Sequence, residues 1–178
     1  MNNKGITLPE LLIVIAIITI LTSASFVGYG RRQKEVLLQK ETNLLVAKAE
    51  QVREMAISAK HFYGDLPQGG YGVYFNLSQP EFFIVFADCD GDNLFDSTGT
   101  PCSGHSELVE RVDLEGGVYI KNLCAPSVSI TFVPPSPNVF IRTPGEVLID
   151  ECVLTLGIQG STKEKKIHFN SAGLIYAE

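Results

Sequence analysis

A single carboxylate, Glu10, stands in an otherwise uncharged apolar segment that extends from Ile6 to Val27. As an α-helix, a segment of this length reaches about 33 Å, which is enough to cross a lipid bilayer. A carboxylate there costs up to about 3 kcal/mol on insertion scales, so Glu10 is a candidate functional group. Lys4 and Gly5 precede the segment, whereas the cleavage site of an ordinary secretory signal follows its apolar region. A cut after Gly5 would leave the hydrophobic helix on the protein and create a new amino group on Ile6, close to Glu10.

The segment from Lys4 to Leu12 resembles the prepilin processing site of type IV pilins and type II secretion pseudopilins. In that family a membrane peptidase cuts after the glycine and methylates the new N-terminus. The resemblance therefore implies cleavage between Gly5 and Ile6, N-methylation of Ile6 and a role for Glu10 in assembly. It also implies three partners, namely the prepilin peptidase, the membrane and other pilin or pseudopilin subunits. The expected location is the cytoplasmic membrane, crossed once, with the globular domain outside the cytoplasm and incorporated into a pilus or pseudopilus.

A second group of residues that could do chemistry is an acidic loop with carboxylates at Asp88, Asp90, Asp92 and Asp96. Carboxylates at alternate positions can converge on a hard cation such as calcium. The bidentate Glu that closes a calcium loop is missing, since Gly99 stands in its place. The alternative is a solvated turn whose aspartates cap backbone N–H groups, and the missing ligand slightly favours it. Any calcium would stiffen the loop, and no cofactor is required.

The four cysteines lie in the C-terminal half of the chain, at Cys89, Cys102, Cys124 and Cys152. An even number in an exported domain indicates two disulfides, although four cysteines allow three pairings. Pairs that close local loops are favoured, which selects Cys89–Cys102 and Cys124–Cys152. A zinc site is disfavoured, because the chain has no CxxC pair and its histidines are scattered.

A small basic group near the C-terminus consists of Lys163, Lys165, Lys166 and His168. It is the best local support for DNA binding, but a solvated strand edge is the simpler interpretation. The whole chain is acidic, with 14 Lys and Arg against 20 Asp and Glu, so nucleic acid is an unlikely partner. His61, His105 and His168 lie in unrelated segments without a nucleophile motif, and we expect no enzymatic activity.

The elements that must position these residues follow from hydrophobic periodicity. Beyond Arg31, apolar residues recur every seven positions at Leu38, Leu45, Val52 and Ala59, which predicts one helix reaching about Phe62. Glycine and proline clusters then separate short β-prone runs, the last two forming a hairpin. The runs are Tyr71–Asn76, Glu81–Asp88, Val118–Leu123, Val128–Val133, Val139–Arg142, 146–149, Val153–Ile158, Lys166–Asn170 and Leu174–Tyr176.

This pattern predicts an α+β fold with a long N-terminal helix and a β-rich C-terminal domain, and the resemblance to pilins implies a pilin-like fold in which the helix packs on an antiparallel β domain. The expected parts are a leader peptide (1–5), a transmembrane and assembly helix (6–28), its amphipathic continuation (29–63) and a β-rich domain (64–178). The segments Ala49–Ile57 and Phe86–Asp92 resemble the H-type pseudopilin and related minor pilins. The expected function is a minor pilin or pseudopilin, a filament subunit. The alternatives are a DNA-uptake minor pilin and a calcium-stabilised, adhesin-like surface subunit.

Overall fold

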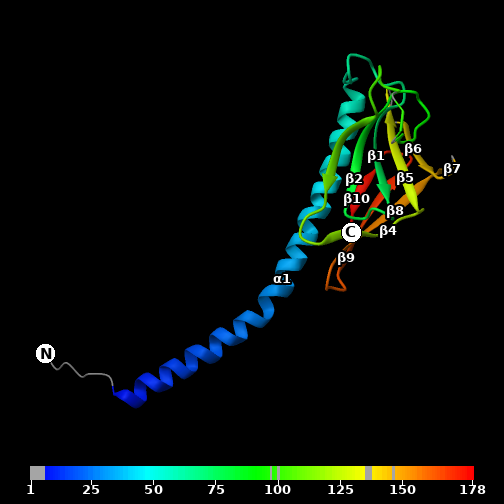
Figure 1. The fold of residues 1–178 in the computed structure, drawn as a ribbon. Coiled ribbons are helices and arrows are strands. Elements are labelled where there is room, and N and C mark those ends of the chain that lie inside the picture. Colours follow the sequence, from blue (N-terminus) through cyan, green and yellow to red (C-terminus); the bar gives the residue numbers. More distant parts are fainter. Residues whose placement is uncertain (1–6, 97, 100, 135–137, 146) are drawn as a thin grey trace. The chain divides into compact units, whose positions relative to one another are not determined.

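The computed structural model describes residues 7–178 except 97, 100, 135–137 and 146, and the side chains of 24–31 also lie outside the described set. The described chain forms one long helix followed by antiparallel strands, so the predicted α+β arrangement is confirmed (Figure 1). The helix is α1 (Leu8–Ile57). The strands are β1 (Gly70–Asn76), β2 (Phe82–Asp88), β3 (Leu108–Asp113), β4 (Val118–Asn122), β5 (Ser127–Val133), β6 (Asn138–Thr143), β7 (Val147–Ile149), β8 (Glu151–Ile158), β9 (Glu164–Asn170) and β10 (Ile175–Ala177).

The chain divides into two compact units between Val36 and Leu37, inside α1. The first unit is the N-terminal part of the helix. Its backbone stays helical through Gly28–Gly30. The second unit holds the rest of α1 and all the described strands.

In the second unit, α1 buries the predicted stripe against the β domain. Leu38, Leu45 and Val52 are buried in one hydrophobic cluster with residues from both sheets. The predicted fourth member of the stripe is wrong, because the helix ends at Ile57 and Ala59 is exposed. Ala59 has a φ of 48°, and its N–H donates to the carbonyl of Ala56.

A Schellman motif explains this early stop. The N–H of Lys60 donates to the carbonyl of Met55 at 3.1 Å, which is the longer bond of that motif. The shorter bond runs from Ala59 to Ala56 at 3.0 Å. The left-handed residue of the motif is usually glycine. Because alanine stands here, the sequence lacks the usual signal for a helix end.

The buried face of α1 also carries a charged residue. Glu41 is fully buried, and one carboxylate oxygen accepts the N–H of Glu115 at 3.3 Å. Lys40 Nζ lies 3.3 Å from the other oxygen and also binds Glu115 at 2.8 Å. The helix is thereby tied to the loop between β3 and β4.

The strands form two antiparallel sheets, one in the order β3-β2-β1-β5-β6-β7 and the other in the order β10-β9-β8-β4. Each predicted β-prone run corresponds to a described strand within a few residues, and the terminal β9–β10 hairpin is present. The prediction missed β3, an edge strand in which Val112 alone is buried. Its charged residues Glu110, Arg111 and Asp113 obscure the alternation, and such charges are typical of sheet edges.

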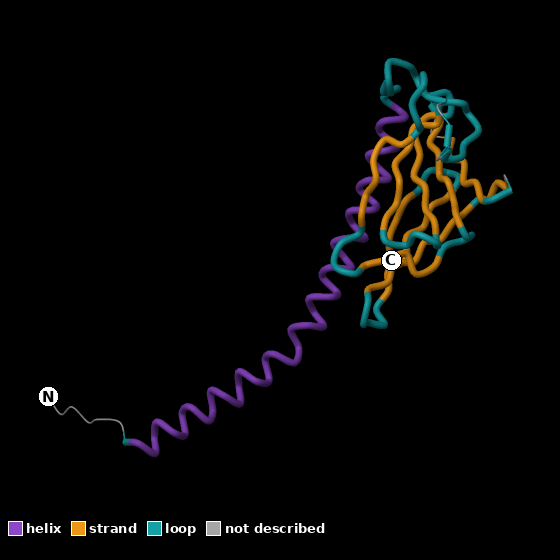
Figure 2. Tube along the Cα trace, in the orientation of Figure 1, coloured by secondary structure: helices purple, strands orange, loops and turns teal. Residues whose placement is uncertain are grey.

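The core lies between the two sheets and the helix. Phe75 of β1 packs on Phe83 of β2 and on Phe169 of β9, with ring centroids 5.7 and 5.9 Å apart. Figure 2 shows the strands gathered into one body with the loops at its ends. The acidic loop that follows β2 is one of these loops.

Candidate functional site

The acidic loop begins where β2 ends and folds back over the outer face of the six-stranded sheet. The Phe95 ring packs on Tyr74 of β1 and Phe86 of β2, with centroids 5.2 and 5.6 Å apart. The N–H of Phe95 donates to the hydroxyl of Ser129 on β5. The ring packing of Phe95 and its hydrogen bond to Ser129 therefore hold this polar loop against the sheet.

Asp88 organises the first turn of this loop from inside the protein. Its side chain is fully buried, and its two oxygens accept the N–H groups of Gly91 and Asn93, each at 2.7 Å. Burial raises the pKa of Asp88 to about 6, against the opposing effect of these two hydrogen bonds. A Cβ on Gly69 would overlap the Asp88 carboxylate, so glycine is required beside it.

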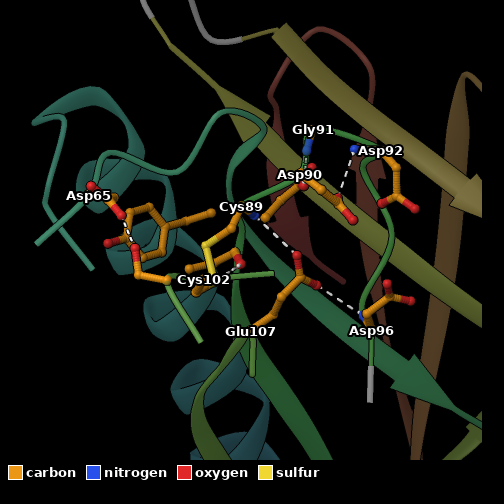
Figure 3. The surroundings of a disulfide bond; sticks show 12 residues. Asp65, Cys89, Asp90, Gly91, Asp92, Asp96, Cys102 and Glu107 are labelled. Carbon is orange, nitrogen blue, oxygen red and sulfur yellow. Dashed lines mark hydrogen bonds between the residues drawn. A yellow bond between two sulfur atoms is a disulfide. The ribbon is translucent and has the colours of Figure 1, made fainter. Parts of the chain in front are cut away.

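Glu107, which the sequence analysis did not single out, organises the rest of the loop. Its fully buried carboxylate accepts the N–H of Cys89 at 3.1 Å and that of Asp96 at 2.9 Å (Figure 3). Burial raises the pKa of Glu107 to about 7, against these hydrogen bonds and with the nearby Asp88 charge adding to the rise. Glu107 directly precedes the missed strand β3 and has no motif around it, so no local signal could have identified it.

The structure divides the four predicted calcium ligands between two groups. Ligand oxygens of Asp90, Asp92 and Asp96 lie within 4.8 Å of one another, and so do those of Asp88, Asp90 and Glu107. The aspartates also cap backbone groups, because Asp90 accepts the N–H of Asp92 and Asp92 accepts the N–H of Leu94. Both interpretations of the loop thus have geometric support, and a cation could be held by the exposed group.

The predicted disulfide Cys89–Cys102 is present and fastens the returning segment to the start of the loop. Two tight turns meet beside it, each closed by a pair of backbone hydrogen bonds, from Phe62 to Asp65 and from Cys102 to His105. Both central residues of each turn have positive φ, as in a type I′ turn. The Tyr63 ring stacks on His105 with centroids 3.8 Å apart.

A pocket of about 280 Å³ opens between these turns, and the disulfide forms part of its wall. Polar groups of Asp65, Gln68 and Ser103 line it together with Leu66 and Pro101. The Ser103 hydroxyl donates to the Asp65 carboxylate and joins the two turns across the pocket. The second predicted disulfide, Cys124–Cys152, is also present and lies between the β4–β5 connection and β8.

The structure does not gather the three predicted DNA-binding lysines onto one face. Lys163 lies in the β8–β9 turn, whereas Lys165 and Lys166 are neighbours on β9 and so point to opposite sides of the sheet. Glu164, which stands between Lys163 and Lys165 in the sequence, forms an ion pair with Lys121 of β4 at 2.6 Å. His61 directly precedes the first of the two tight turns and His105 closes the second, whereas His168 lies on β9.

At the other end of the chain, Glu10 closes the start of α1. The N–H and the hydroxyl of Thr7 both donate to one Glu10 oxygen at 3.4 Å, and the Thr7 carbonyl accepts the N–H of Leu11. Thr7 is thus the N-cap residue, and Glu10 reaches back to it as in a capping box. The predicted cleavage residues Gly5 and Ile6 lie outside the described residues.

The helix that follows Glu10 is apolar on all sides. Leucine, isoleucine and valine side chains from Leu8 to Leu21 are all at least 48 % exposed. Its hydroxyls are satisfied within the helix, since Thr19 and Thr22 donate to the carbonyls of Ile15 and Ile18 at 2.8 Å. No helix within the described residues combines the length and hydropathy that a membrane crossing needs. Ile6 and the side chains of 24–28 lie outside that set, so the crossing by 6–28 stays a prediction.

Comparison with known proteins finds a family match at the N-terminus. Residues 1–26 match the family model described as the prokaryotic N-terminal methylation motif. No curated protein and no solved structure matches the chain. The N-terminal segment therefore carries a prepilin-type methylation motif.

Proposed function

We propose that this chain is a minor pilin or pseudopilin, a structural subunit of a type IV pilus or a type II secretion filament. The observation that carries the proposal is the methylation motif over residues 1–26. In this proposal the cut follows Gly5, Ile6 is the methylated residue and Glu10 is the acid that acts in assembly. A long helix joined to an antiparallel β domain supports the same assignment.

Processing after Gly5 is compatible with the local structure of the helix start. Pro9 lacks an N–H and would clash with a helical residue four positions earlier, which is Gly5. In the processed chain Pro9 lies in the first helical turn, whose N–H groups have no helical partner. Thr7 caps the helix next to the new terminus on Ile6. Pro9 therefore disfavours a helix that continues back through Gly5, which is compatible with peptidase access to the bond that follows Gly5.

Assembly follows from the apolar surface of the first unit. A helix that is apolar on all sides is stable when lipid or other helices cover it. The hydroxyl groups of Thr19 and Thr22 are bonded within the helix, so covering them leaves no unsatisfied donor. Glu10 would be costly in such a bundle without a positive partner, and the methylated amine of Ile6 is that partner. Because Glu10 already reaches back to Thr7, pairing with its own chain is the favoured geometry.

The partners that follow are the prepilin peptidase, the membrane and other pilin or pseudopilin subunits. We assign no catalytic role to the chain and expect the subunit to act structurally. The resemblance of Ala49–Ile57 and Phe86–Asp92 to the H-type pseudopilin supports a place in that branch or among related minor pilins.

A second candidate is a calcium-stabilised surface subunit, favoured by the three exposed carboxylates of Asp90, Asp92 and Asp96. Calcium would hold the loop rigid together with Cys89–Cys102. DNA uptake is not proposed, because Lys165 and Lys166 point to opposite sides of β9 and Glu164 places a negative charge next to Lys165 in the sequence.

The test is the intact mass and N-terminal peptide of the full chain, expressed with and without a prepilin peptidase. Loss of residues 1–5 and gain of one methyl group on Ile6, only when the peptidase is present, is the expected result. Gly5→Leu should retain the leader, whereas Asn3→Ala, a matched change in the leader, should be processed normally. A chain that keeps its leader beside an active peptidase would remove the main support for a filament subunit.

A further inference from the structure

His168 on β9 lies between two carboxylates that come from different strands. Its Nδ1 is 3.0 Å from a carboxylate oxygen of Glu151, the first residue of β8. Its Nε2 is 2.9 Å from a carboxylate oxygen of Glu178, which directly follows β10. The ring is 14 % exposed, whereas the two glutamate side chains are 56 % and 61 % exposed.

This arrangement requires a proton on each ring nitrogen. An ionised carboxylate can only accept hydrogen bonds, so both imidazole nitrogens must donate to satisfy both contacts. A neutral imidazole has one N–H, and its other nitrogen presents a lone pair to the second carboxylate. The two carboxylates lie on opposite sides of the ring, so they do not converge with it on a metal ion. Glu151, His168 and Glu178 therefore form a cluster that favours the protonated imidazole of His168.

The strand that this contact holds is short and lies at the edge of its sheet. β10 is an edge strand of three residues and pairs with β9 alone. Beyond it, the main chains of Glu178 and Lys166 exchange hydrogen bonds of 2.9 and 3.2 Å. Tyr176, the partner of His168 across the ladder, stacks on the ring with centroids 4.6 Å apart. The His168 ring thus contacts the Tyr176 side chain of β10 and the Glu178 side chain that follows this strand.

The other charged groups near the ring are few. Lys166 lies on the same face of β9, two residues before His168, and Glu164 on that face is paired with Lys121 of β4. β8 contributes Glu151, and β10 contributes Tyr176 and the adjoining Glu178. The ring therefore meets two negative charges directly and one positive charge at the next position along its strand.

We propose that protonated His168 is a latch that fastens β10 to the four-stranded sheet, and that loss of its proton releases this strand. Release uncovers the backbone edge of β9 and the buried side chain of Ile175, which the latched strand holds in the core. The proposal concerns the β domain and does not depend on the filament function.

The direction of the pH effect follows from the two states of the ring. The hydrogen bond to Glu151 raises the pKa of His168 above its ordinary value of 6.5, helped by Glu178 and opposed by partial burial. A released ring returns to the ordinary pKa. The latch is therefore complete below about pH 6.5, and its contribution is lost as the pH rises through the higher pKa of the latched state. Each unit between the two pKa values corresponds to about a tenfold change in the opening equilibrium.

Hydrogen exchange of the full chain in detergent micelles, followed by mass spectrometry from pH 5.5 to 9, tests the latch. After correction for the intrinsic pH dependence of exchange, peptides covering β10 should lose protection above pH 6.5, about tenfold for each unit of raised pKa. Peptides covering β5 should not. His168→Phe keeps the stacking on Tyr176 but removes both donors, so the protection of β10 should be low and independent of pH, like that of the parent protein at high pH.

Two variants separate the latch from a general loss of folding. Glu178→Gln changes an exposed side chain, should leave the fold intact and should reduce the pH dependence of β10 exchange. His105→Phe changes a stacked histidine elsewhere and should behave like the parent protein. Protection of β10 that is independent of pH in the parent, or equal in His168→Phe and the parent, would overturn the proposal.

Discussion

At the scale of single residues, two buried carboxylates shape the loop that follows β2. Asp88 and Glu107 each accept two backbone N–H groups, and together they fix four N–H groups between Cys89 and Asp96. Hydrogen bonds from N–H groups offset part of the cost of burying an acid, but the raised pKa of both groups means that burial dominates. These acids are therefore structural anchors that resist ionisation.

Replacing Glu107 with Gln should change how stability depends on pH. The pKa of Glu107 is about 7 in the folded protein and 4.5 without its surroundings, so the folded state binds the proton more firmly. The free energy of unfolding therefore falls by up to about 3 kcal/mol as the pH rises from 4.5 to 7 and Glu107 ionises. In Glu107→Gln the free energy of unfolding should therefore fall less between pH 4.5 and 7 than in the parent protein. Urea unfolding at several pH values in this range measures the difference. Glu54→Gln, an exposed change on α1, is the control, and equal slopes in all three proteins would contradict the prediction.

Ala59 is a second residue at which a local conformation has a measurable cost. Its positive φ disfavours a side chain by about 1–2 kcal/mol, whereas glycine adopts it freely. Ala59→Gly should stabilise the protein by about 0.5–1 kcal/mol after the added flexibility of the unfolded chain is included. Ala56→Gly, three residues earlier inside the helix, should destabilise by about 1 kcal/mol or more. Denaturant midpoints measure both, and a loss of stability in Ala59→Gly would argue against the Schellman end.

At the scale of elements, the acidic loop and the two tight turns form one cross-linked assembly at the end of β2. Phe95 anchors the loop on the six-stranded sheet, and Cys89–Cys102 ties it to the turn that stacks on Tyr63. The disulfide closes a separation of 13 residues, whereas Cys124–Cys152 closes one of 28. The first bond therefore closes the shorter loop, and the second joins the β4–β5 connection to β8.

Removing Cys89–Cys102 should loosen this assembly without disturbing the sheets. The double change of Cys89→Ser and Cys102→Ser should lower stability by about 3 kcal/mol and speed hydrogen exchange in 101–107. Replacing Cys124 and Cys152 by serine should destabilise by a similar amount while leaving exchange in 101–107 unchanged until global unfolding. Identical exchange in both variants would mean that the first bond does not hold the turn.

Calcium should stabilise the loop if the exposed carboxylates act together. At ten times its dissociation constant, a ligand that binds only the folded state adds about 1.4 kcal/mol. Thermal unfolding of the full chain in detergent should therefore shift upward with calcium chloride, and the shift should disappear in Asp92→Asn. Asp113→Asn, an exposed carboxylate on β3, should keep the shift. No shift in the parent protein would leave backbone capping as the role of these aspartates.

At the scale of the whole molecule, one chain combines an apolar helical segment with a polar, disulfide-bonded β domain. The first segment exposes its leucine, isoleucine and valine side chains along the described length, so it needs a covering of lipid or neighbouring helices. The β domain has its own core of buried residues. The proposed filament meets both requirements, because helices pack in its interior while the β domains face outward.

Glu10→Val should separate processing from assembly. The cut after Gly5 should still occur, because the leader and the cleaved bond are unchanged. Incorporation into sheared filaments should fall sharply, since an unpaired ammonium in a helix bundle costs about 3–5 kcal/mol. Glu10→Asp, which keeps the charge, should retain part of the incorporation. The ratio of subunit in filaments to subunit in membranes measures this, and normal incorporation of Glu10→Val would remove the proposed role of Glu10.

The sequence by itself was sufficient for features that depend on neighbouring residues. One such feature is the single carboxylate of Glu10 in an apolar run. Another is the seven-residue stripe from Leu38 to Val52, because the spacing of residues along a helix decides which of them share a face. Turn residues likewise marked nearly every strand, and both disulfides close local loops. The helix end at Ile57 was missed because the left-handed residue, Ala59, is not a glycine.

Only the tertiary structure decided which distant residues meet. Glu107 joins Asp88 because β3 pairs with β2, and His168 meets Glu178 because β9 pairs with β10. Strand pairing places residues together according to register, and register depends on the packing of the whole sheet. The burial of Glu41 has the same origin, since the Glu115 loop reaches the helix only after β3 and β4 are placed. The site chemistry therefore depended on long-range packing that no short motif encodes.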